Sequence, residues 1–127
     1  MPDSHDGDMD ESIDQMFEEL EVERETDREG VVIVRNSGAI ASMRRARVGE
    51  SVYLMLIRTD RNQQGRGHAS ELLAEICNAA DRNGVCLFLE VEKGDDGNLS
   101  ESQLMDWYWR FGFRGEREEM VREPQTK

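Results

Sequence analysis

A short loop between residues 64 and 69 has the composition of a phosphate-binding turn. Its six residues are Gln64, Gly65, Arg66, Gly67, His68 and Ala69. If a helix begins directly after the glycines, its first backbone N–H groups have no partners within the helix and lie at the positive end of the helix dipole. Glycines leave these N–H groups accessible because they carry no side chain. The loop therefore predicts a seat for phosphate, although two glycines with this spacing also occur in ordinary turns.

The segments on either side of this loop predict a strand and a helix. Ser51–Thr59 is the most continuous apolar run, and we expect it to be a central strand that is buried on both faces. After the loop, apolar residues recur with helical spacing up to the stop signal Asn83-Gly84. They are Ala69, Leu72, Leu73, Ile76 and Ala80. Strand, turn and helix thus place the loop at a helix N-terminus.

The same loop resembles the acetyl-CoA pyrophosphate loop of the GNAT superfamily of N-acetyltransferases, whose pattern is Q/R-x-x-G-x-G/A. Further segments resemble the family in its order and at nearly its spacing between about Val52 and Pro124. They are Leu89-Glu90-Val91, the run from Trp107 to Phe113, and a closing segment with Met120, Arg122 and Pro124. The resemblance implies an α/β protein with the GNAT acyl-CoA N-acyltransferase fold, a mixed central sheet flanked by helices. The compact size and the run from Trp107 to Phe113 are also similar to small acetyltransferases of bacteriophages.

The resemblance also implies the ligand and the reaction. Acetyl-CoA would be the acyl donor, with its pyrophosphate on the Gln64–Ala69 loop. Ile57, Arg58 and Thr59 would stand where the family leaves backbone N–H groups free for the pantetheine arm and the thioester oxygen. The acetyl group would pass directly to a primary amine, which needs a base for the amine and an acid for the leaving thiolate. No covalent nucleophile is needed, and the sequence predicts no metal site.

Two residues are candidates for the acid and the base. Tyr108 occupies the tyrosine position that the resemblance implies, and a phenol has a pKa near that of a thiol, so it can protonate the leaving thiolate. Glu90, in an apolar strand context, corresponds to the glutamate of the ribosomal-protein alanine acetyltransferases. An exposed strand carboxylate is the alternative for Glu90, and Glu92 is its rival. We expect the neighbouring aromatic residues to pack in the core, and they are Trp107, Trp109 and Phe111.

An acidic N-terminal arm carries nearly all of the net charge of −12. Residues 1–30 contain 13 acidic and two basic side chains, a net charge of −11, which leaves −1 for the other residues. Residues 1–9 are expected to be a disordered tail, and 10–30 an amphipathic helix and linker. The helix should run from Asp10 to about Arg24 and lay an apolar stripe on the sheet. The stripe consists of Ile13, Met16, Phe17 and Leu20.

The acetyltransferase domain is expected to span residues 31–124, followed by a tail at 125–127. The predicted elements are a hairpin of Val31–Val34 and Ala39–Val48, a strand at Val85–Glu92, a helix at Glu101–Arg110 that begins with a capping box at Ser100 and Gln103, and a closing strand at Glu116–Arg122. The hairpin carries the one dense basic cluster, of Arg44, Arg45 and Arg47. We expect it to lie on a solvent face and to pair with the acidic helix, or to contact phosphates.

Composition narrows the function further. The chain has no apolar run that would span a membrane and no secretion leader, so we expect a cytoplasmic protein without a membrane partner. Cys77 and Cys86 lack metal or redox spacing and are expected to be buried free thiols.

The acidic arm makes nucleic acid an unsuitable ligand and favours a cationic acceptor, either a small amine such as a polyamine or a protein lysine or N-terminus. A homodimer is left open.

Two other functions remain open at this point. The chain could be a non-catalytic protein of the same fold that binds a partner through its acidic helix, especially if the apolar stripe of that helix does not dock on its own domain. It could also be an acidic mimic of nucleic acid, an interpretation that depends on the arm alone.

Overall fold

Seven strands form one mixed sheet in the computed structural model, which describes residues 12–20, 23–46, 51–59, 67–91 and 100–125. The strands are β1 (Glu23–Thr26), β2 (Val32–Arg35), β3 (Ala39–Arg45), β4 (Ser51–Thr59), β5 (Cys86–Leu89), β6 (Arg114–Glu116) and β7 (Glu119–Arg122). Their order in the sheet is β1-β2-β3-β4-β5-β7-β6. Only β4 and β5 pair in parallel among these strands, because helix α2 (His68–Asn83) makes the crossover between them.

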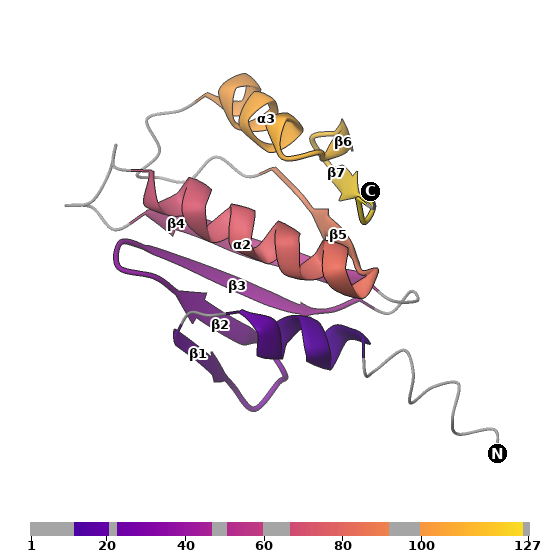
Figure 1. The fold of residues 1–127 in the computed structure, drawn as a ribbon. Helices are drawn as coiled ribbons and strands as arrows, with labels where there is room; N and C mark the ends of the chain where they lie inside the picture. Colours follow the sequence, from indigo (N-terminus) through magenta and orange to yellow (C-terminus); the bar gives the residue numbers. More distant parts are fainter. Residues whose placement is uncertain (1–11, 21–22, 47–50, 60–66, 92–99, 126–127) are drawn as a thin grey trace, which may run out of the picture.

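The core lies between one face of the sheet and the helices (Figure 1). Strand residues that point to this face are buried, whereas the residues between them are half-buried or exposed. The N-terminal helix, described over residues 12–19, and α2 supply the other side of the core. The buried strand residues include Val32, Val34, Ala41, Met43, Val52, Leu54, Leu87 and Leu89. Helix α3 (Glu101–Arg110) adds Tyr108 to the same core.

The acidic N-terminal helix is part of this core. Its predicted stripe is confirmed, because Ile13, Met16, Phe17 and Leu20 are all buried. Two acids on the helix pair with basic residues of the domain. Asp14 forms an ion pair with Arg45 of β3, and Glu19 accepts a hydrogen bond from Arg82 of α2 at 2.7 Å, which lowers the pKa of Glu19. A stripe free to bind a partner, the feature that favoured a non-catalytic protein, is thus not found in the described helix.

The helix is shorter than predicted. The expectation that it continues to Arg24 is wrong, because Glu23–Thr26 forms the edge strand β1 and pairs antiparallel with β2. A tight turn joins the two strands, in which the Asp27 carboxylate accepts hydrogen bonds from the backbone N–H groups of Glu29 and Val31. An acidic sequence becomes a strand here because β2 offers a partner.

The closing strand is also different. The segment predicted as one strand at Glu116–Arg122 is a hairpin, in which β6 and β7 pair antiparallel around a turn at residues 117–118. Gly115 has a φ of +128°, and a Cβ atom there would lie 2.5 Å from the Glu119 carbonyl oxygen. The hairpin therefore needs glycine at this position.

Replacing Met16 by alanine tests whether the acidic helix stabilises the domain. The side chain is fully buried, so we expect the free energy of unfolding to fall by about 2 kcal/mol in urea denaturation. Glu18→Ala, on the exposed face of the same helix, is the matched control and should leave the stability almost unchanged. An equally small effect of Met16→Ala would show that the helix is dispensable.

Candidate functional site

The sheet opens between β4 and β5. The two strands pair from Ser51 with Cys86 to Leu54 with Leu89. There β5 ends, whereas β4 continues to Thr59. At the same point the register between β3 and β4 shifts, because Met43 pairs with Leu54 and Ser42 with Leu56, so that Met55 forms a bulge. Residues 55–59 of β4 therefore have no partner on the β5 side among the described strands.

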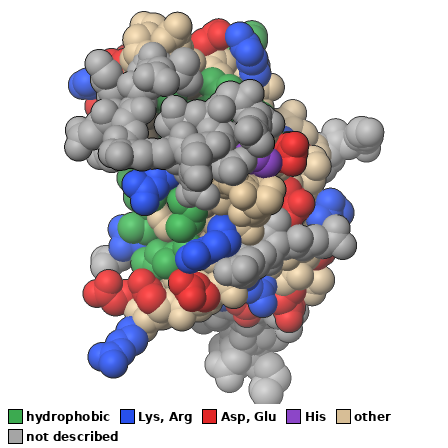
Figure 2. Space-filling view, turned by 90° about the vertical axis from the view of Figure 1, so that its left-hand side faces the viewer, with side chains coloured by type: hydrophobic (Ala, Val, Ile, Leu, Met, Phe, Trp, Pro, Cys, Tyr) green, Lys and Arg blue, Asp and Glu red, His purple; other side chains and the backbone are tan. Residues whose placement is uncertain are grey.

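The opening exposes apolar side chains that the sequence analysis placed in the core. Met55 and Leu56 are 41% and 45% exposed, so the prediction that β4 is buried on both faces is wrong for its second half. On this end of the molecule hydrophobic side chains gather in a patch beside basic side chains (Figure 2). Neither Met55 nor Leu56 was singled out from the sequence, because only the length of β5 decides which part of β4 stays covered.

The three residues predicted to contact pantetheine lie along the opened part of β4. Ile57 packs partly against the core, Arg58 is exposed and Thr59 is half-buried. All three pair with β3 on one side, at Ala41, Ile40 and Ala39 respectively. Their other edge faces the opening between β4 and β5.

The phosphate seat, by which we mean the first turn of α2 from Gly67 onward, lies after the end of β4 in the chain. Gly67 is the N-cap of α2 with a φ of +80°, and as a glycine it has no side chain that could cap the helix. Its carbonyl accepts the first helical hydrogen bond, from the Glu71 N–H at 3.0 Å. Ala69 packs partly against the core. The predicted residues Gln64, Gly65 and Arg66 lie outside the described residues.

Helix α3 is attached to the same turn. It begins with the predicted capping box, in which the Ser100 hydroxyl accepts from the Gln103 N–H at 3.2 Å and the Gln103 side chain accepts from the Ser100 N–H at 2.7 Å. One turn before its end, the Trp107 indole N–H donates to the hydroxyl of Ser70 in α2 at 3.0 Å. This contact places the C-terminal half of α3 beside the phosphate seat.

Tyr108, the predicted acid, is buried in α3. Its ring packs against Trp107 at 5.0 Å and against Phe113 at 5.7 Å between ring centroids. Burial raises the pKa of Tyr108 to about 12, because the phenolate would lose its hydration. The phenol therefore keeps its proton at neutral pH, but burial makes it a weaker acid than an exposed phenol.

Glu90, the predicted base, directly follows the last residue of β5. It thus lies at the point where β4 and β5 separate, although its side chain is exposed and lacks the apolar surroundings expected from the sequence. Its rival Glu92 lies outside the described residues. The backbone places Glu90 at the opening, and its exposure allows contact with an acceptor or with water.

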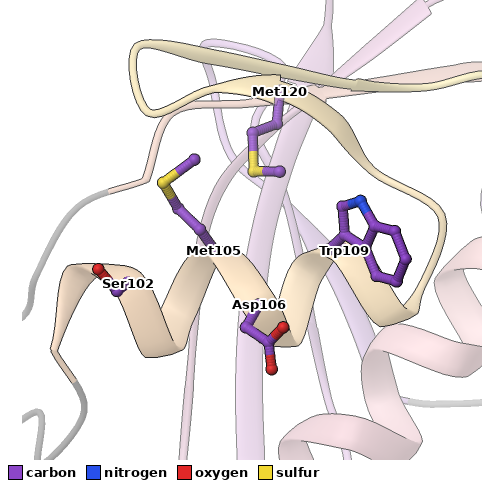
Figure 3. Close-up of a pocket in the computed structure, with 5 residues that line it drawn as sticks. All are labelled: Ser102, Met105, Asp106, Trp109 and Met120. Atoms are coloured by element: carbon purple, nitrogen blue, oxygen red, sulfur yellow. The ribbon is translucent and has the colours of Figure 1, made fainter.

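The three aromatic residues of α3 and its C-cap that were expected to pack in the core differ in their exposure. Trp107 and Phe111 pack partly against the core as expected. Trp109 does not, because it is 54% exposed and its ring lies under the Arg114 guanidinium at 4.1 Å. A shallow pocket of about 440 Å³ opens beside it, with Met105 and Met120 reaching into the space between α3 and the β6–β7 hairpin (Figure 3). Its described lining includes none of the predicted site residues.

The described residues contain no group of three or more histidine, cysteine or acidic side chains placed to hold a metal ion. They also contain no helix long and apolar enough to cross a membrane. Cys77 and Cys86 form no disulfide; Cys77 is buried, and burial raises the pKa of its thiol to about 12, whereas Cys86 is only half-buried.

Comparison with solved structures identifies the fold. The E. coli ribosomal-protein-S18-alanine N-acetyltransferase is similar with a TM-score of 0.59 and 18% identity, over 80% of this chain and 74% of that one. The anti-CRISPR protein AcrVA5 gives a TM-score of 0.59 and 18% identity, over 72% and 97%. Tetrahymena GCN5 gives 0.57 and 10%, over 78% and 71%. No curated protein sequence matches this chain.

An opened mixed sheet beside an uncapped helix is thus the acyl-CoA N-acyltransferase fold, as the sequence analysis predicted. The sequence profile of the GNAT acetyltransferase family matches residues 2–113. The chain therefore belongs to the GNAT acetyltransferase family.

Proposed function

We propose that this protein transfers an acetyl group from acetyl-CoA directly to a primary amine. The observation that carries the proposal is a coincidence of two features in one short stretch of chain. The sheet opens beyond Leu54 and Leu89, and the helix that follows β4 starts at Gly67 without a side-chain cap. An open strand edge and an uncapped helix N-terminus both leave backbone hydrogen-bonding groups without partners in the element, so these groups can bind a ligand.

The residues present fit acetyl-CoA. The uncapped first turn of α2 suits the pyrophosphate, and the edge of Ile57, Arg58 and Thr59 suits the amide-bearing pantetheine arm. The exposed Met55 and Leu56 give the opening an apolar border. When bound, acetyl-CoA supplies the activated acetyl thioester. Gln64, Gly65, Arg66, Gly67, His68 and Ala69 remain the proposed phosphate contacts.

The chain's own groups then perform three tasks. The free N–H groups of β4 hold and polarise the acyl oxygen. Tyr108 holds a proton on its hydroxyl at neutral pH and donates it to the departing thiolate. Glu90, exposed at the opening, removes the proton from the acceptor amine, directly or through water.

The acceptor is proposed to be a cationic amine, either a small molecule or a protein lysine or N-terminus. The net charge of −12 supports this choice, since long-range attraction raises the encounter rate with cations. The paired acids Asp14 and Glu19 contribute less to this field than the sequence suggested, because Arg45 and Arg82 neutralise them. Incubation with acetyl-CoA and a panel of spermidine, a lysine peptide and an α-amino peptide, followed by mass spectrometry, tests the acceptor class.

Binding of the donor is tested with a charge placed in the phosphate seat. Wild-type protein should bind acetyl-CoA in calorimetric titration, and Gly67→Glu should bind at least about thirtyfold more weakly, since a like charge against the pyrophosphate costs about 2 kcal/mol or more. Gly30→Glu is the matched control: Gly30 has a φ of +85°, and at both glycines a Cβ atom would meet none of the described residues within 4 Å. The two variants thus share the backbone strain and the added charge.

The outcomes separate clearly. Loss of binding in Gly67→Glu alone supports the donor site. Equal weakening in both variants would assign the effect to strain or net charge, and absence of binding by the wild type would refute the proposed function.

A further inference from the structure

We propose that Asn36, in the turn between β2 and β3, is a positioning residue for the phosphate seat. This inference rests on the proposed function, because the seat is the turn assigned to the donor pyrophosphate. Asn36 does not belong to the predicted loop and is separated from α2 by 32 residues in sequence. It acts through the backbone of α2 and not by touching the donor.

The side-chain amide of Asn36 joins two elements. Its Nδ2 donates to the backbone carbonyl of His68, the first residue of α2, at 2.9 Å. Its Oδ1 accepts from the N–H groups of Gly38 and Ala39 at 3.0 and 2.8 Å. The first contact ties the helix, and the other two fix the side chain to its own turn. One half-buried amide thus fastens the β2–β3 turn to the start of α2.

The His68 ring completes this attachment. It lies against Gly38 so closely that a Cβ atom there would be 2.2 Å from the ring, and its Nδ1 is 3.5 Å from the Ser37 hydroxyl. A side chain at position 38 would therefore have to displace the His68 ring. His68 is thus held in two ways, by the packing of its ring against Gly38 and by the hydrogen bond from Asn36 to its carbonyl.

The attachment solves a problem that a phosphate seat creates. Many helices satisfy one of their first N–H groups with the side chain of the N-cap residue. Such a cap on α2 would occupy a donor that the pyrophosphate needs, and the N-cap Gly67 has no side chain to supply one. The uncapped turn consequently requires another anchor. Asn36 supplies it through the carbonyl of His68 and leaves the N–H groups free.

Removal of the amide should loosen the seat and weaken donor binding. We expect Asn36→Ala to raise the Kd for acetyl-CoA about fivefold, as the loss of one intramolecular hydrogen bond allows. Asn83→Ala is the matched control, because Asn83 donates to the Ala79 carbonyl at the same distance of 2.9 Å, at the opposite end of α2. Asn83→Ala should lose about as much stability as Asn36→Ala, but it should bind acetyl-CoA like the wild type.

A second readout reports on the seat without a donor. Hydrogen exchange at the Glu71 amide, which closes the first turn on Gly67, should accelerate in Asn36→Ala and stay slow in Asn83→Ala. If Asn36→Ala does not fold, Gly38→Ala serves in its place, since its methyl group must displace the His68 ring. The same weakening of acetyl-CoA binding is expected for it.

The results distinguish the two proposals. Wild-type binding that Asn36→Ala or Gly38→Ala leaves unchanged would overturn the positioning role and leave the proposed function intact. The role would equally be overturned if Asn83→Ala weakened binding as much as Asn36→Ala. If wild-type protein does not bind acetyl-CoA, the proposed function fails and this inference fails with it.

Discussion

Replacing Tyr108 by phenylalanine is expected to lower kcat for acetyl transfer by roughly 100-fold or more, because a general acid contributes about that much to the rate. The ring remains, so its contacts with Trp107 and Phe113 should keep the fold and the affinity for acetyl-CoA. Tyr53, the only other tyrosine, is the matched control, and Tyr53→Phe should retain kcat. Steady-state kinetics with the amine found in the acceptor panel measures the effect.

The pH dependence of kcat gives an independent check on Tyr108. Because burial raises its pKa to about 12, the donating form persists as the pH rises from neutral to about 10. The wild-type kcat should therefore not fall in this range through loss of the Tyr108 proton. The pH profile of Tyr108→Phe should have the same shape as that of the wild type. Retention of full kcat by Tyr108→Phe would show that the residue only packs in the core.

The boundaries of the elements around the candidate site could be predicted because their signals are local. The capping box at Ser100 and Gln103 fixed the start of α3, and Asn83-Gly84 fixed the end of α2, where Gly84 has a φ of +67°. Hydrogen bonds between residues that are close in sequence decide such boundaries, so they can be predicted without knowledge of tertiary contacts. The predicted bounds of β4 are also those of the structure.

The errors concern features that depend on a distant partner. Strand β1 exists because β2 pairs with it, and nothing in its acidic residues 23–26 indicates a strand. Exposure of the second half of β4 depends on where β5 ends. The hydrogen bond from Asn36 to α2 could not be predicted, because the sequence Asn-Ser-Gly indicates a turn whether or not a helix packs against it. By contrast, the exposure of Trp109 was available from helical spacing, since Leu104, Trp107, Tyr108 and Phe111 already fill the inner face of α3.

A buried ion pair between α2 and β7 was also missed, and it leads to the largest expected effect on stability. Arg122, which is 5% exposed, donates to both carboxylate oxygens of Asp81 at 2.6 and 3.0 Å and to the Phe111 carbonyl at 2.5 Å. The Gln125 N–H adds a further bond to Asp81 at 2.8 Å. Arg122→Met should lower the free energy of unfolding by about 3 kcal/mol, because it leaves the half-buried Asp81 carboxylate without its main partner.

The pH dependence of stability should change in the same variant. Burial acts to raise the pKa of Asp81, but the hydrogen bonds from Arg122 and Gln125 outweigh it and lower the pKa below its ordinary value. A lowered carboxyl pKa stabilises the fold above the ordinary value of about 3.9, and this stability is lost as the pH falls through the folded pKa. Urea denaturation between about pH 5 and pH 2 should therefore show a larger loss of stability on acidification in the wild type than in Arg122→Met.

Arg110→Met is the control for Arg122→Met, because it breaks the exposed Arg110–Asp106 pair, whose side chains are 70% and 62% exposed. Such a pair contributes only about 0.3 kcal/mol, so the control should unfold like the wild type at every pH. The double variant Arg122→Met with Asp81→Leu should recover part of the lost stability, since it no longer buries a lone charge. Equal losses in the two single arginine variants would mean that the Asp81–Arg122 pair contributes no more than a surface contact. The β6–β7 hairpin would then be held mainly by the pairing of β7 with β5 and by the burial of Met120.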